Sequence, residues 1–389
     1  MDPVRNPFAP GAGSQPPELA GRDDIIENAR ITIGRSLGGK PARSQILLGL
    51  RGTGKTVLLN RIERLAAEMG MQTSFIEAPE GKTLASLLYP KLSQTLRRVS
   101  LSDRAKHHAH AAMRALRGFA SVFKIDIGDV SLSVDPEPGV ADSGNLEYDL
   151  IDLFTKVGEA AQAAGTGWTL LIDELQYVDE ADLASLIVAL HRGAQLGLPI
   201  LFFGAGLPQI AALSGNAKSY AERLFEFPPV GPLTQDAARA AIREPIEAEE
   251  EAIDDDALNA LIEQTGCYPY FLQEWGYQAW NTADQSPIDR QDVETASRAA
   301  IERLDQSFFR VRFDRLTPKE REYVFAMARL GDGPYRSADV AAELHEDLRT
   351  LGPRRASIIA KGMIYSPAHG DIAFTVPMFD DFLRRVEIG

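Results

Sequence analysis

The sequence is poor in cysteine, because Cys267 is the only one among 389 residues. A single cysteine excludes a disulfide within the chain and any zinc site built from several thiolates, as is usual in a reducing compartment. The fold must therefore be supported by packing. Apolar residues make up 44% of the sequence, which is enough for well-packed cores, and the length predicts roughly two or three domains.

Long apolar runs are missing as well. No stretch approaches the length of a membrane span. The first residues, MDPVRNPFAPGAGSQPPELAGRD, contain no apolar region of the kind found in signal peptides. We therefore expect a cytoplasmic protein without a membrane partner.

Basic residues are outnumbered by acidic ones. The chain has 41 lysines and arginines against 55 aspartates and glutamates, which gives a formal net charge of −14. A surface that is basic everywhere is excluded, so any nucleic-acid contact must be confined to one local face. The acidic run EAEEEAIDDD, residues 247–256, is typical of a solvated loop between helices.

One stretch, GLRGTGKT, contains the pattern G-x-x-x-x-G-K-[ST], with Gly49, Gly54, Lys55 and Thr56 at the fixed positions. The apolar run before it predicts a short buried strand, and the run after it has helical periodicity. A strand, a glycine-rich turn and a helix are the context in which this pattern binds phosphate. The alternative, a glycine-rich turn that binds nothing, is disfavoured by both flanks.

The chemistry of a phosphate loop explains its residue types. Glycines allow backbone N–H groups to surround an anion, and the helix N-terminus adds the positive end of its dipole. Lys55 would reach the outer phosphates of ATP, and the hydroxyl of Thr56 would bind Mg²⁺. The loop residues expected at the nucleotide are Gly49, Arg51, Gly52, Thr53, Gly54, Lys55 and Thr56.

Two carboxylates, Asp173 and Glu174, end the apolar run in TLLIDELQYVD. An apolar strand of this kind brings both side chains to the carboxyl edge of a sheet. In phosphate-loop proteins the first carboxylate supports Mg²⁺ and the second can polarise the attacking water. Acidic residues often follow strands, so the pair alone is weak evidence for a catalytic site. It becomes strong evidence because a phosphate loop precedes it in the chain.

The order of elements predicts an α/β core. Two continuous apolar strands, residues 168–172 and 199–203, are separated by a helix over 180–195, which indicates a parallel sheet covered on both faces. Alternating apolar and polar residues around a Gly-Asp turn predict a β-hairpin inserted into this core near 123–134.

Changes in pattern divide the chain into four parts. Residues 1–20 are rich in proline and glycine and predict an extended arm. The nucleotide-binding core would occupy 21–232, and a small helical lid would follow over 233–304. The last segment, 305–389, begins with helices and ends with short alternating strands.

The combination of GLRGTGKT, LLIDELQYVD, an early PPELAGRD and a helical lid resembles the AAA+ superfamily of P-loop NTPases. More narrowly, the chain resembles the branch that contains the STAND signalling ATPases, the archaeal-type ATPases and the origin-recognition initiators. This resemblance implies that Gly21 and Arg22, in the Gly-Arg before the first core helix, line the adenine pocket. The alternative is a plain loop before a helix.

Two sensor positions of AAA+ motors lack their usual side chains. The strand after the acidic pair ends in Gly204-Ala205-Gly206, which supplies no polar side chain. The lid stretch GCYPYFLQEWG contains no arginine, although its Gly266 and Pro269 resemble the Gly-x-Pro lid element of STAND proteins. Pro269 would then pack on the nucleotide; a helix-starting proline after a glycine cap is the alternative.

One arginine, Arg223 in SYAERLFEF, resembles the AAA+ arginine finger, which acts on the nucleotide of a neighbouring subunit. It could instead pair on the surface with Glu222 or Glu226. With Glu174 present and both sensors lacking, we expect slow ATP hydrolysis by a switch rather than a motor. The finger implies assembly into a nucleotide-dependent homo-oligomer.

The last segment predicts a winged helix. A first helix opens with Thr317 as its cap, a second covers 337–344, and a third over 353–361 has Arg354 and Arg355 in its first turn. Two short strands flank the turn PAHGD. The third helix of such a module would enter the major groove of DNA with its N-terminal residues nearest the bases, so we expect Arg354 and Arg355 at DNA.

Two functions remain open. The chain could be an ATP-gated switch that binds double-stranded DNA through the winged helix. It could also be a STAND-like signalling or defence ATPase whose winged helix binds protein, because basic and acidic residues nearly balance in the last segment.

Overall fold

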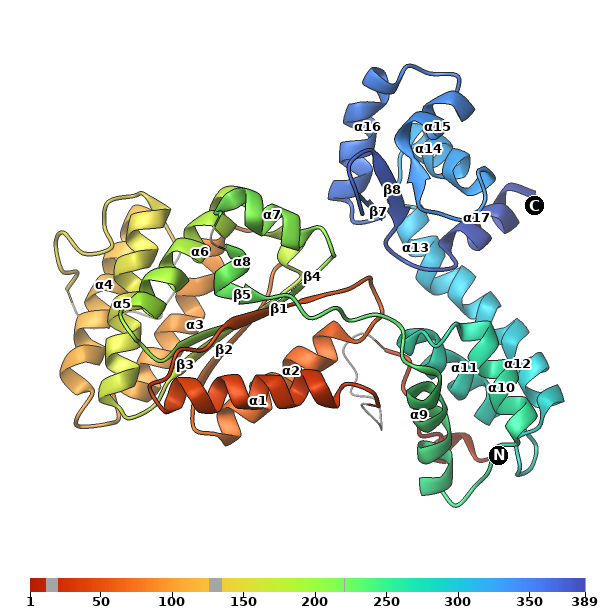
Figure 1. Cartoon of the computed structure of the whole chain (residues 1–389), viewed down its shortest axis with the longest axis horizontal. Coiled ribbons are helices and arrows are strands. Elements are labelled where there is room, and N and C mark those ends of the chain that lie inside the picture. Colours follow the sequence, from red (N-terminus) through yellow and green to blue (C-terminus); the bar gives the residue numbers. More distant parts are fainter. Residues whose placement is uncertain (12–19, 126–134, 220, 389) are drawn as a thin grey trace. The chain divides into compact units, whose positions relative to one another are not determined.

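The computed structural model describes residues 1–11, 20–125, 135–219 and 221–388. The hairpin predicted near 123–134 lies mostly outside these residues. The chain forms two compact units. We call Asp23–Gly49 together with Lys55–Val230 the sheet unit, and Met1–Arg22, Leu50–Gly54 and Gly231–Gly389 the helical unit (Figure 1).

The sheet unit is built on a parallel five-stranded sheet, as the sequence predicts, with strand order β2-β3-β4-β1-β5. The strands are β1 (Ser44–Leu48), β2 (Gln72–Glu77), β3 (Trp168–Asp173), β4 (Ile200–Gly206) and β5 (Phe225–Glu226). Every residue of β3 is buried, which explains its continuous apolar sequence.

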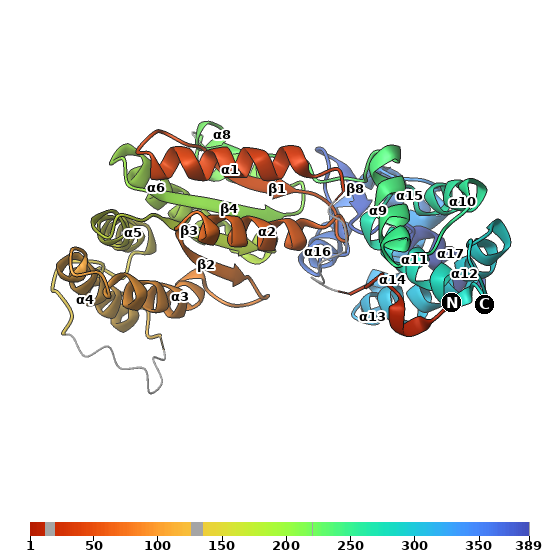
Figure 2. The same cartoon turned by 90° about the horizontal axis from the view of Figure 1, so that it is seen from below.

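Helices cover both faces of this sheet. On one face α1 (Asp23–Leu37) and α2 (Lys55–Glu68) pack on Leu171 and Phe203, and on the other face Leu170 and Phe202 join a second core with the remaining helices (Figure 1). There α3 packs beside β2, and α4 packs beside α3 (Figure 2). These helices are α3 (Leu84–Val99), α4 (Lys106–Val122), α5 (Leu146–Ala163), α6 (Glu180–Gln195), α7 (Ile210–Ala217) and α8 (Ala221–Leu224).

The four helices predicted in the lid segment belong to the helical unit. They are α9 (Gln235–Ala248), α10 (Asp255–Thr265), α11 (Pro269–Thr282) and α12 (Arg290–Arg303), and α12 runs on into the π-helical η3 (Leu304–Phe309) and α13 (Arg310–Phe313). The first residues of the chain pack on α11. Phe8 is buried there, and its ring occupies the space that a Cβ on Gly276 would need.

The end of the helical unit combines helices with a small antiparallel sheet of order β6-β8-β7. Its elements are α14 (Pro318–Arg329), β6 (Tyr335–Arg336), α15 (Ser337–Glu343), α16 (Leu348–Ala360), β7 (Ile364–Tyr365), β8 (Asp371–Phe374) and α17 (Phe379–Ile388). We call residues 318–388 the C-terminal module. Thr317 caps α14 in a capping box with Glu320, which confirms the predicted start of this helix.

The predicted start of the third helix of this module is wrong. Pro353 reads as a first helical residue, but α16 begins at Leu348, where Asp347 accepts a hydrogen bond from the N–H of Arg349. Pro353 therefore lies inside the helix. Arg354 and Arg355 lie in the middle of α16 and not in its first turn.

A buried carboxylate ties α16 to α14. Glu320 Oε2 lies 2.6 Å from Lys361 Nζ, and Ser357 Oγ donates a hydrogen bond of 2.6 Å to Glu320 Oε1. Burial alone would raise the pKa of Glu320, but the hydrogen bonds from Lys361, Ser357 and Thr317 together lower it to about 2. The carboxylate thus stays charged and fixes the position of α16.

No helix in the described ranges is long and apolar enough to cross a membrane.

Candidate nucleotide-binding site

The phosphate-loop sequence lies between β1 and α2, in the strand–loop–helix context that the pattern requires. Gly52 and Gly54 have φ angles of +84° and +90°, which only glycine adopts without strain. Lys55 is the first residue of α2 and is 8% exposed. Leu50–Gly54 group with the helical unit, whereas Lys55 and Thr56 group with the sheet unit.

The predicted magnesium ligands meet in the sheet unit. Thr56 Oγ1 donates a hydrogen bond of 2.5 Å to Asp173 Oδ2, and Asp173 is 2% exposed at the carboxyl end of β3. Burial raises the pKa of Asp173, and the hydrogen bonds from Thr56 and from the N–H of Glu174 oppose this rise. A buried carboxylate beside a hydroxyl offers the hard oxygen atoms that Mg²⁺ prefers, so these two residues fit the ion.

Glu174 occupies an unusual backbone position. Its φ and ψ angles are 56° and 42°, in the left-handed region that non-glycine residues rarely adopt. Its N–H donates to Asp173 Oδ1 at 2.8 Å. Its carboxylate accepts a hydrogen bond from Gln176 Nε2 in the following 3-10 turn, η2 (Leu175–Tyr177). Such backbone strain at a polar residue is typical of functional sites.

Arg22 contacts the backbone of the phosphate loop within the helical unit. Its guanidinium donates to the carbonyl of Thr53 at 3.3 Å and to the carbonyl of Gly231. Burial lowers the pKa of Arg22. Gly21 has φ +66°, and a Cβ there would lie 2.7 Å from the Cβ of Ala237. The predicted role of both residues at the adenine is still a prediction.

Gly266 and Pro269 have clear structural roles in the lid. Gly266 is the left-handed cap that ends α10, and Pro269 is the first residue of α11. This is the alternative that the sequence left open for the pair. Contact between Pro269 and a nucleotide stays a prediction.

Three residues that the sequence analysis missed hold the phosphate loop. The hydroxyl of Tyr268 donates to the carbonyl of Arg51, and the N–H of Tyr270 donates to the carbonyl of Gly52 at 3.1 Å. The N–H of Arg51 donates to the carbonyl of Thr375 at 3.1 Å. Burial raises the pKa of Tyr268, so its hydroxyl stays protonated and can donate.

Arg223 lies in α8 beside β5, at the edge of the sheet, and is exposed. No ion pair within the described part of the chain includes it. Glu226 accepts a hydrogen bond from Asn28 Nδ2 at 2.8 Å. The strand order places β4 and β1 between β5 and β3. Arg223 precedes β5, at the amino end of that strand, whereas the acidic pair lies at the carboxyl end of β3.

The two arginines predicted at DNA are engaged within the chain. Nη1 and Nη2 of Arg354 each lie 3.1 Å from a carboxylate oxygen of Glu346, and the Arg354 side chain is 16% exposed. Arg355 donates to Ser337 Oγ at 2.9 Å. Arg355 thus connects α16 to the start of α15, and Arg354 connects it to the segment between α15 and α16.

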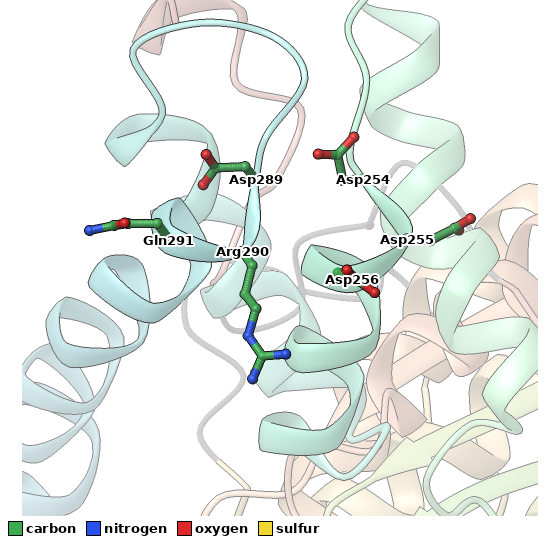
Figure 3. A pocket seen from close by; sticks show the side chains of 6 residues that line it. All are labelled: Asp254, Asp255, Asp256, Asp289, Arg290 and Gln291. Atoms are coloured by element: carbon green, nitrogen blue, oxygen red, sulfur yellow. The ribbon is translucent and has the colours of Figure 1, made fainter.

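A cavity of about 550 Å³ lies at the N-terminal ends of α10 and α12 (Figure 3). Its lining residues are Asp254, Asp255, Asp256, Asp289, Arg290 and Gln291. The four aspartates are exposed, and two have local roles: Asp289 caps α12, and Asp255 pairs with Arg243. Across the described residues no group of three or more His, Cys, Asp or Glu side chains could hold a metal. We therefore interpret the cavity as a solvent-filled space between the N-terminal ends of two helices.

Two protein families match separate parts of the chain. Residues 18–203 match the family described as AAA ATPase domain, and residues 306–383 match a family described as a domain of unknown function. No curated protein matches the chain. Residues 18–203 are therefore similar to AAA ATPase domains, which supports a nucleotide-binding function.

Solved structures with some similarity to this chain align over nearly all of it. A Walker-type ATPase of Pyrococcus abyssi is 16% identical with a TM-score of 0.57, over 94% of this chain and 99% of that one. The Orc1 protein of Aeropyrum pernix in complex with DNA is 14% identical with a TM-score of 0.47, over 98% and 96%. The RuvB Holliday junction branch migration motor of Thermotoga maritima is 14% identical with a TM-score of 0.45, over 96% and 99%. The first of these shows that the chain shares the fold of that Walker-type ATPase.

Proposed function

We propose that the chain is an ATP-binding switch that hydrolyses ATP slowly and transmits its nucleotide state from the phosphate loop to the lid and the C-terminal module. The observation that carries this proposal is that Tyr268, Tyr270 and Thr375 hold the backbone of the loop. Tyr268 and Tyr270 belong to the start of α11, and Thr375 follows β8.

Nucleotide binding rests on the loop and on the acidic pair. Backbone N–H groups and the N-terminus of α2 provide positive potential for phosphates, and Lys55 adds a charge at the same helix end. Thr56 and Asp173 would hold Mg²⁺, which when bound neutralises charge on the outer phosphates. Glu174 would orient and polarise the attacking water.

The switch follows from competition for loop peptides. Phosphate loops bind anions through backbone N–H groups. The N–H of Arg51 donates to the carbonyl of Thr375. The carbonyls of Arg51 and Gly52 accept hydrogen bonds from the two lid tyrosines. A nucleotide that turns these peptides toward its phosphates must break or rebuild the three contacts. The free energy of the hydrogen bonds that the loop makes with the lid and the C-terminal module then depends on whether nucleotide is bound, as a switch requires.

Slow turnover is supported by the two sensor positions. The end of β4 carries no polar side chain, and the start of α11 carries no arginine. Fewer groups would then stabilise the charge that develops on the transferred phosphoryl group. Arg223, exposed at the sheet edge, would supply such a charge to the nucleotide of a neighbouring copy in a nucleotide-dependent homo-oligomer.

Hydrogen exchange tests the switch. The N–H of Tyr270 lies in the first turn of α11, where no intrahelical acceptor exists, so its protection depends on the carbonyl of Gly52. We expect a non-hydrolysable ATP analogue with Mg²⁺ to speed exchange of this amide by on the order of tenfold. The Lys55→Ala variant serves as the control and should show no change. If the analogue alters exchange only within residues 44–60, the chain binds nucleotide but is not this switch.

The C-terminal module supports the winged-helix part of the proposal. Three helices, α14, α15 and α16, precede the antiparallel pair β7 and β8. In a winged helix that binds DNA, the first turn of the third helix would lie nearest the bases. That turn contains Arg349, which is exposed, rather than Arg354 and Arg355. We propose that duplex DNA is contacted from this turn.

A protein partner is the second candidate for the module. The ion pair of Arg354 with Glu346 and the near balance of basic and acidic residues in 305–389 favour it. The chain would then be a STAND-like signalling ATPase whose module binds protein.

Salt dependence of binding to random duplex DNA separates the two candidates. If Arg349 contacts a phosphate, Arg349→Ala should weaken binding and lower the salt slope by about one. The comparison variant Lys319→Ala removes an exposed cation that is paired with Glu322 and should leave the slope unchanged. Failure of the parent protein to bind duplex DNA at low salt would exclude the DNA candidate and leave the protein-binding one.

A further inference from the structure

The glycines at the end of β4 make room for a turn. A Cβ on Gly204 would lie 2.5 Å from Leu175 Cδ1, and a Cβ on Gly206 would lie 3.2 Å from Gln176 Oε1. The 3-10 turn after β3 thus packs directly over the carboxyl end of β4. The strand carries no polar side chain there because side chains of the neighbouring turn occupy the space.

Gln176 makes two hydrogen bonds in this position. Its Nε2 donates to Glu174 Oε2, and its Oε1 accepts from the N–H of Leu207 at 3.3 Å, directly after β4. An ionised carboxylate only accepts and a backbone N–H only donates, so the two partners fix which way the amide points. Gln176 thereby connects the side chain of Glu174 to the end of β4.

The contact extends a chain of hydrogen bonds across the sheet edge. Thr56 donates to Asp173, the N–H of Glu174 donates to Asp173, and Gln176 donates to Glu174 and accepts from Leu207. All five residues belong to the sheet unit. The chain therefore connects the proposed magnesium ligands to the strand end that lacks a sensor.

We propose that Gln176 is a positioning residue that holds the Glu174 carboxylate for catalysis and supplies the polar group that β4 lacks. This inference rests on the proposed ATPase function. A carboxylate oxygen offers more than one lone pair, so the amide can fix the orientation of Glu174 while the group still accepts from water. The left-handed backbone of Glu174 brings its side chain within reach of Gln176, which is only two residues further along.

Single substitutions of Gln176 test the proposal. Gln176→Ala removes both hydrogen bonds and should lower kcat roughly 10- to 100-fold, as loss of a supporting partner does at other catalytic sites. Gln176→Glu fills the same space but, when ionised, cannot donate to Glu174, so it should lose a similar factor. The dissociation constant for ATP, measured by titration, should change less than about threefold in both variants, because neither touches the phosphate loop.

The control is Gln195→Ala, which changes an exposed glutamine at the end of α6 and should leave kcat and affinity as in the parent. Thermal unfolding shows whether each variant is folded. A kcat of Gln176→Glu equal to that of the parent would show that Gln176 only fills space. This result would overturn the inference about Gln176 but not the proposed ATP hydrolysis. A parent that binds ATP without any turnover would overturn both the inference and the proposed hydrolysis.

Discussion

Lys55→Ala is expected to abolish ATP binding, with a loss of affinity of at least roughly 100-fold, or about 2.7 kcal/mol. Lys55 is buried at the first position of α2, where its charge and the helix dipole would act on the same phosphates. Alanine keeps the helix, because it is the best helix former, and removes the ammonium group together with the rest of the side chain. Titration with a fluorescent ATP analogue measures the effect.

The control for this prediction is Lys82→Ala, which removes an exposed lysine from the loop before α3 and should leave affinity unchanged. Thermal unfolding without nucleotide should confirm that both variants are folded. If Lys55→Ala and the parent bind ATP equally well, the phosphate-loop interpretation is wrong, and with it the proposed function.

The core of the fold could be predicted because its strands are buried on both faces. The continuous apolar runs at β3 and β4 carry the periodicity of such strands, and their bounds differ from the prediction by only a few residues. Asp173 and Thr56 could be paired in advance because the carboxyl edge of a parallel sheet brings loop ends together. These features depend on local pattern and on simple topology.

The start of α16 could not be predicted from the same rules. A proline usually begins a helix or follows its end, so Pro353 suggested a helix start. Asp347, six residues earlier, caps the helix instead, and Pro353 is accommodated in its interior. Because the helix begins earlier than predicted, Arg354 lies beside Glu346 and forms an ion pair within the chain, where the sequence predicts a contact with DNA.

The contacts around the phosphate loop also lie beyond sequence reasoning. Tyr268 and Thr375 are more than 200 residues from Arg51 along the chain. Of the three contacts with the loop, those of Tyr270 and Thr375 join backbone atoms only, which carry no residue-specific signal. Gln176 is close to Glu174 in sequence, but their contact requires the left-handed backbone of Glu174. A non-glycine residue in that conformation is held by its surroundings and cannot be read from its own type.

Glu174→Gln is expected to lower ATP turnover by at least roughly 100-fold while ATP affinity changes less than about threefold. Glutamine has the same shape but cannot take a proton from the attacking water. The hydrogen bond between Thr56 and Asp173 does not involve the changed side chain, so the magnesium ligands should keep their positions. The Gln176 amide can still donate to the new carbonyl oxygen, so the turn over β4 should also persist.

Phosphate release under saturating ATP measures the turnover of Glu174→Gln, and titration with an ATP analogue measures its affinity. The control, Glu180→Gln, changes an exposed carboxylate in the first turn of α6 and should leave both values as in the parent. Unchanged turnover in Glu174→Gln would mean that the water is activated by another group. In that case Gln176 would have no catalytic carboxylate to position, and the strained backbone at Glu174 would serve only the packing of the turn against Gly204 and Gly206.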